Sequence, residues 1–121
     1  LDPTNPAASA MAKIGEANGF AGGDAFVGES YDAAALMMLA MASAKSSDPQ
    51  VYKDHIMKVA NGTGEKIYPG ELAKGIKLAS YGVAIDYVGA SSVTLIGPGE
   101  AAGNFREIQI QNGKMVDVNY R

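Results

Sequence analysis

Residues 33–42 read AAALMMLAMA, ten consecutive positions without a polar side chain. As an α-helix this run is about 15 Å long, about half the hydrocarbon thickness of a bilayer, so it cannot cross a membrane. A helix that is apolar on every side is typically covered by protein on every side. We therefore expect the run to form the middle of a core helix over about 25–45, lying between a sheet and other elements.

Capping signals predict further helices around this one. Asn5-Pro6 and Asp48-Pro49 each place a capping side chain directly before a proline, which favours a helix start. Apolar residues also recur at helical spacing after Tyr68-Pro69-Gly70. The predicted helical front of the chain therefore consists of helices over about 6–18, 25–45, 49–60 and 71–81.

The last forty residues alternate between apolar and polar positions, which predicts strands and loops. Asn112-Gly113 is expected to close a C-terminal β-hairpin with strands over about 104–111 and 114–119. A two-residue turn there would set Ile108 against Asp117, whereas a three-residue loop sets Ile108 against Val116. We predict the three-residue loop, because it pairs two apolar residues.

The composition is that of one small domain or a piece of a larger one. The chain has 121 residues, a net charge of −3 and no cysteine, which excludes disulfides, thiol nucleophiles and thiolate metal sites. Leu, Ile, Val and Phe make up 25 residues, just above the roughly 20% below which disorder is expected, so the core should be thin. Lys and Arg are scattered singly, so we expect no nucleic-acid partner.

A polar cluster, Glu29-Ser30-Tyr31-Asp32, stands directly before the apolar run. An aromatic ring beside a carboxylate can hold an ammonium group by charge, hydrogen bond and ring face together. Glu29, Tyr31 and Asp32 are therefore candidate ligand-binding residues. Two other interpretations stay open: the carboxylates only favour the first helical turns electrostatically, or Glu29 and Asp32 form the acid–base pair of an enzyme.

The remaining motifs predict no metal, cofactor or catalytic residue. His55 stands beside Asp54 without a second histidine, which is typical of a solvated or partly packed side chain. Residues 97–103, GPGEAAG, miss the dinucleotide-binding spacing by one residue, and residues 62–66, GTGEK, lack the phosphate-loop spacing. We expect a loop and a turn at these positions.

Residues 26–36, FVGESYDAAAL, resemble the YDA helix of type I periplasmic solute-binding proteins, the branched-chain amino-acid receptor family of ABC importers. Three later blocks follow in the order found in that family: YPGELAK at 68–74, IDYVGASS at 85–92 and EIQIQNGK at 107–114. Together the blocks cover nearly the whole chain, but they correspond only to about the last third of a family member.

The resemblance implies an α/β protein with a partial type I periplasmic-binding-protein fold. Members of the family have two lobes, each a parallel sheet flanked by helices, which are joined by three crossovers and close on a small solute. Residues 1–92 would be the last helices of the first lobe, and residues 93–121 the crossover and terminal strands of the second lobe. We expect such a fragment to self-associate or to pair with the rest of its chain.

The same resemblance implies an extracytoplasmic solute-binding component of an ABC importer, not an enzyme. It would bind an amino acid or related small solute by two-lobe closure, in the periplasm or anchored outside the membrane, and a membrane ABC permease would be its partner. Carried over from the family, Asp32 would meet the ligand ammonium, with Tyr31 and Glu29 beside it. The alternative is a ligand-sensing regulatory or receptor domain of the same fold.

Overall fold

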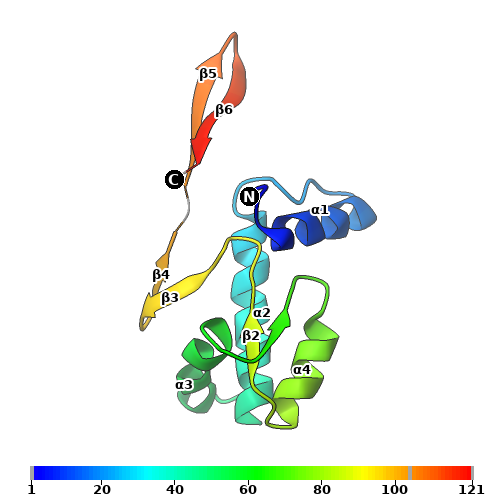
Figure 1. Cartoon of the computed structure of the whole chain (residues 1–121), viewed down its shortest axis with the longest axis vertical. Coiled ribbons are helices and arrows are strands. Elements are labelled where there is room, and N and C mark those ends of the chain that lie inside the picture. The colour runs from blue at the N-terminus through cyan, green and yellow to red at the C-terminus, as the bar shows by residue number, and fades with distance from the viewer. Residues whose placement is uncertain (1, 104, 121) are drawn as a thin grey trace.

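The computed structural model describes residues 2–103 and 105–120 and combines helices with small sheets, as expected at the level of an α/β protein (Figure 1). The N-terminal part is mainly helical and the C-terminal part is built of strands. In the described residues the elements are α1 (Pro6–Asn18), α2 (Val27–Ala44), α3 (Pro49–Ala60), β1 (Glu65–Ile67), α4 (Leu72–Ser80), β2 (Ile85–Tyr87), β3 (Thr94–Gly97), β4 (Glu100–Ala102), β5 (Arg106–Gln111) and β6 (Lys114–Tyr120).

Two helices begin at the capping side chains predicted from the sequence. Asn5 Oδ1 accepts a hydrogen bond from the Ala7 amide at 2.9 Å, and Asp48 Oδ1 accepts one from the Gln50 amide at 2.9 Å. A proline follows each cap and fixes the first helical φ. The predicted bounds of α1 and α3 are therefore confirmed, and α2 and α4 lie within two residues of their predicted bounds.

A strand–helix–strand unit forms the centre of the molecule. β1 and β2 run parallel, with Glu65 opposite Ile85 and Ile67 opposite Tyr87, and α4 connects them. The sequence did not predict β1: a turn was expected over residues 62–66, and this is wrong for Glu65 and Lys66, which form the first part of the strand. Against this unit packs α2, which contacts both α3 and α4.

Only one side of α2 is buried. Ala35, Leu36 and Leu39 pack into a core with residues of α3, α4, β1 and β2. On the other side Met37 and Met38 are 43% and 41% exposed. The prediction that protein covers the apolar run on every side is therefore wrong for the described residues; alanine and methionine present little or flexible apolar surface, so the helix forms with one side open.

The C-terminal strands form two hairpins that extend from the helical part, with β5 and β6 reaching furthest away (Figure 1). β3 pairs with β4 through a bulge between Leu95 and Gly97, so part of the predicted loop over 97–103 is strand. Every residue of β5 and β6 is exposed. Position 104, where we predicted the first hairpin strand to begin, lies outside the described residues.

The predicted register of the last hairpin is wrong. Asn112 and Gly113 both have positive φ, 51° and 74°, and form a two-residue turn that pairs Ile110 with Met115 and sets Ile108 against Asp117. Asn-Gly favours this turn because its twist matches that of the strands. Pairing of apolar residues does not decide the register here, because both faces of the hairpin are exposed.

Candidate functional site

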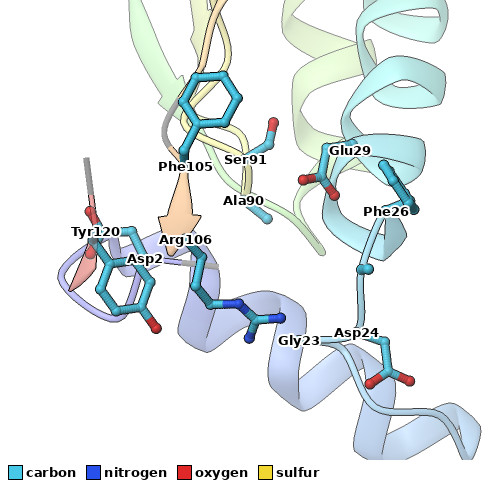
Figure 2. A pocket seen from close by; sticks show the side chains of 11 residues that line it. Asp2, Gly23, Asp24, Phe26, Glu29, Ala90, Ser91, Phe105, Arg106 and Tyr120 are labelled. Carbon is cyan, nitrogen blue, oxygen red and sulfur yellow. The ribbon is translucent and has the colours of Figure 1, made fainter. Parts of the chain in front are cut away.

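A cavity of about 160 Å³ lies where the start of α2, the loop after β2 and the base of the β5–β6 hairpin meet (Figure 2). Small ligands of α/β proteins commonly bind beyond the carboxyl ends of parallel strands, and the loop after β2 is such an end. A cavity of about 150 Å³ holds a benzene molecule, so this one suits a solute of about six non-hydrogen atoms. Two hollows of about 360 Å³ have a single charged side chain in their lining: one adjoins this cavity and shares Gly23 and Arg106 with it, and the other contains Lys58.

Charged groups of both signs and aromatic rings line this cavity. In Figure 2 the Glu29 carboxylate enters from α2, while the guanidinium of Arg106 extends from β5 toward Gly23 and Asp24. The excess of carboxylates favours a cationic group on the solute, and the rings add cation–π attraction. The lining comprises three carboxylates, one guanidinium, three rings and four small residues: Asp2, Asp24, Glu29, Arg106, Phe26, Phe105, Tyr120, Gly23, Ala25, Ala90 and Ser91.

The start of α2 has an unusual backbone at this cavity. Phe26 precedes the helix with a φ of 67°, which is uncommon for a bulky residue, and its side chain makes no capping hydrogen bond. The ring is 76% exposed. Strained backbone of this kind is often found at ligand sites.

Asp32 lies behind the wall of the cavity and is only 1% exposed. Its Oδ1 accepts hydrogen bonds from the Tyr87 hydroxyl at 2.7 Å and the Ala90 amide at 3.0 Å. Its Oδ2 accepts from the Ser91 amide at 2.7 Å and the Ser91 hydroxyl at 2.5 Å. A carboxylate offers about four lone-pair positions, and all are used. In this geometry Asp32 has no position left for the direct ammonium contact that we predicted; it fixes the loop after β2 instead.

A second side chain holds the same loop from the opposite direction. Asn5 Nδ2 donates to the Gly89 carbonyl and to Ser92 Oγ, each at 2.9 Å. At Gly89 a Cβ atom would collide with the Asp32 carboxylate, so glycine is needed for this close approach. Residues 89–92 are thus held by an acceptor on one side and a donor on the other.

The structure separates the three site residues predicted from the sequence. Glu29 is exposed in the first turn of α2 and lines the cavity. Tyr31 does not line it; the Tyr31 hydroxyl accepts a hydrogen bond from the Gly70 amide at 2.9 Å, and its ring packs against the buried core. Of the three residues, Glu29 therefore lines the cavity, Asp32 supports its wall, and Tyr31 supports the fold.

Tyr87 completes the buried network around Asp32. Burial, together with the charge of Asp32 and the hydrogen bond to it, raises the pKa of Tyr87 far above its usual value. The Tyr87 hydroxyl therefore stays protonated and can only donate toward the carboxylate.

The sequence did not point to several residues of the cavity. Ser91 follows a short strand, and this position at a strand's carboxyl end was a signal that could have found it. Asp24 stands among the glycines that separate two helices. The sequence could not predict Arg106 and Tyr120 as cavity residues. They line the cavity only because of the position of the last hairpin relative to the helical part.

His55 is partly buried, and its Nδ1 lies 2.8 Å from Ser43 Oγ, which links α3 to α2. Among residues 2–103 and 105–120 there is no group of three or more His, Cys, Asp or Glu side chains that could hold a metal ion. Over the same residues, no helix combines the length and apolar character needed to span a bilayer.

Neither a protein-family model nor a curated protein nor a solved structure matches the chain.

Proposed function

We propose that this chain is part of the extracytoplasmic solute-binding component of an ABC importer, and that the cavity at the start of α2 binds an amino acid or a related small solute. The convergence of carboxylates, a guanidinium and aromatic rings on one cavity of about 160 Å³ carries this proposal. Such a set of groups complements a small zwitterion, whose charges are separated by a few bonds.

Each end of the zwitterion has a partner in the cavity. Glu29 and Asp24 supply negative charge for the ammonium group, and Phe26 can add its ring face. The Arg106 guanidinium contacts Asp117 through Nε at 3.6 Å, so its terminal nitrogens remain to bind a carboxylate. In our proposal Asp32 supports the cavity wall and Tyr31 supports the fold.

The cavity also suits a protein that closes around its solute. Glu29 and Ser91 come from the segment 1–92, which we assign to one lobe, and Arg106 comes from 93–121, which we assign to the other. A solute that contacts both segments stabilises their closed arrangement, which the membrane permease would recognise. The open side of α2 and the parallel β1–β2 pair are consistent with a partial lobe of a type I periplasmic-binding-protein fold.

Titration of the ¹⁵N-labelled chain with L-alanine tests the binding site. We expect amide shifts centred on Glu29, Ser91 and Arg106. Glu29→Gln should weaken binding about tenfold, because it removes one charged partner of the ammonium. Asp54→Asn, an exposed change on α3, is the matched control and should bind as the wild type does. Absence of shifts at these residues at millimolar alanine would rule out the proposed site.

Uptake measurements test the role in import. Cells whose receptor carries Glu29→Gln should import labelled amino acid more slowly than wild-type cells at low solute concentration. Binding by the purified chain together with unchanged uptake would instead favour a ligand-sensing domain of the same fold.

A further inference from the structure

We propose that Asp32 is a positioning residue that makes Ser91 a hydrogen-bond acceptor only, so that the cavity selects solutes presenting a donor group at this wall. This inference rests on the proposed solute site and concerns the chemistry that the site accepts. A hydroxyl group has one hydrogen and two lone pairs, so the direction of its hydrogen decides what it can bind.

The hydrogen of the Ser91 hydroxyl is committed to Asp32. The distance from Ser91 Oγ to Asp32 Oδ2 is 2.5 Å, which is typical of a charge-assisted bond to a carboxylate. The Ser91 amide donates to the same oxygen at 2.7 Å. Rotation of the hydroxyl away from Asp32 would break the shorter bond and leave part of a buried carboxylate unpaired, which is costly. A solute that contacts the Ser91 hydroxyl from the cavity therefore meets only lone pairs.

Apart from Ser91, the residues that hold the Asp32 carboxylate in place are mainly outside the cavity lining; of them, Ala90 also lines the cavity. Tyr87 and the Ala90 amide fix Asp32 Oδ1, and Gly89 lacks the Cβ atom that would displace the carboxylate. From the other side Asn5 binds the Gly89 carbonyl. The orientation of Ser91 is thus set before a solute arrives, and binding requires no rearrangement of this wall.

This arrangement discriminates between donors and acceptors of the same size. An ammonium group satisfies the lone pairs of Ser91 and the charge of Glu29 together. A keto or carboxylate oxygen in the same place would face the lone pairs of Ser91 and the negative charge of Glu29. Neither this oxygen nor the Ser91 hydroxyl oxygen would then have a hydrogen-bond donor. L-alanine and pyruvate form a suitable pair of probes, since they share a three-carbon carboxylate skeleton and differ in the donor or acceptor group at the second carbon.

Competitive NMR or calorimetric titration of the whole chain measures the ratio of affinities for these probes. We expect wild type to favour alanine by at least tenfold. In Ser91→Ala, alanine binding should weaken and pyruvate binding should not weaken, because the lone pairs that oppose its keto oxygen are removed, so the ratio falls at least threefold. In Asp32→Asn the hydroxyl hydrogen is no longer held by an ionised carboxylate, so the ratio should fall as well.

A double-mutant cycle shows whether Asp32 acts through Ser91. Asp32→Asn should change the ratio in the wild-type background but not in the Ser91→Ala background. Ser80→Ala and Asp54→Asn, which lie outside the cavity lining, are the matched controls and should keep the wild-type ratio.

The outcomes separate the two proposals. If alanine binds and Ser91→Ala leaves the ratio unchanged, the inference about Ser91 is overturned while the solute site stands. An equal effect of Asp32→Asn in both backgrounds would also overturn it, because Asp32 would then act independently of Ser91. If wild type binds no alanine, the proposed site and this inference fall together. Ser91→Ala tests the acceptor role of Ser91 even if Asp32→Asn does not fold.

Discussion

At the scale of single residues, the network around Asp32 combines a buried charge with a complete set of donors. The Asp32 carboxylate on α2 accepts four hydrogen bonds from one distant segment, donated by the Tyr87 hydroxyl, the Ala90 amide and the Ser91 amide and hydroxyl. A buried carboxylate without partners would destabilise the fold by several kcal/mol, so these donors are needed for stability as well as for the shape of the cavity wall.

Gly89→Ala tests how closely this network is packed. The added Cβ would meet the Asp32 carboxylate, and we expect the free energy of unfolding to fall by about 1–3 kcal/mol, as for other overpacked sites. Gly23→Ala is the control, because nothing lies within 4 Å of its added Cβ, and it should change stability by less than about 0.5 kcal/mol. Urea denaturation measures both; equal stabilities would show that the loop after β2 adjusts freely.

The raised pKa of Tyr87 predicts a loss of stability at high pH. Above the ordinary tyrosine pKa, about 10, the unfolded chain releases this proton while the folded chain keeps it. The free energy of unfolding should therefore be unaffected by this group below about pH 10 and fall by about 1.4 kcal/mol per unit above it. Tyr87→Phe should remove this contribution. Denaturation at pH 9, 10 and 11 compares the two slopes, and parallel slopes would contradict the assignment.

Sequence and structure agree on Asp32 as a special position but differ on its role. The sequence singled it out because a carboxylate stood before an apolar helix. Its burial and its donors depend on Tyr87 and Ser91, which lie 55 and 59 positions away, and no local pattern links such distant residues.

At the scale of elements, local signals predicted the helices and the bounds of the last two strands to within two residues, but they missed β1, β4 and the register of the last hairpin. The caps Asn5 and Asp48 act within a few residues, so the sequence alone determines where α1 and α3 begin. β1 is three residues long and exists through its pairing with β2, a long-range contact that leaves little local pattern. The register of β5 and β6 follows the turn residues, because no buried face selects one pairing over another.

Gly113→Ala tests this control by the turn. Gly113 has a φ of 74°, which costs about 1–2 kcal/mol for a residue with a side chain. We expect the nuclear Overhauser contact between Ile110 and Met115 to weaken or disappear, while the helical part keeps its stability. Asn112→Gly, which permits the same turn, should preserve the contact. Retention of the contact in Gly113→Ala would show that strand pairing, and not the turn, sets the register.

At the scale of the whole molecule, the chain has a helical part with a core and a stranded part without one. The core joins α2, α3, α4, β1 and β2, whereas β5 and β6 have no buried residue. An isolated two-stranded hairpin is at best marginally stable in water. We therefore expect the last hairpin to be stabilised by contact with another protein surface. The candidate cavity lies where the two parts meet, which is why the sequence pointed to Glu29 but not to Arg106 or Tyr120.

Self-association is the expected consequence of the exposed apolar hairpin. Ile110 and Met115 are 66% and 71% exposed and directly opposite each other on one face. We expect sedimentation to show an average mass that rises with concentration in the micromolar to millimolar range, because contact between copies buries this face. Ile110→Thr with Met115→Thr should reduce the rise, since threonine keeps the strand preference but removes apolar surface. Gln109→Thr with Gln111→Thr changes the opposite face and should leave association as in wild type. A wild-type chain that stays monomeric at millimolar concentration would show that the hairpin is stable in water without a second copy.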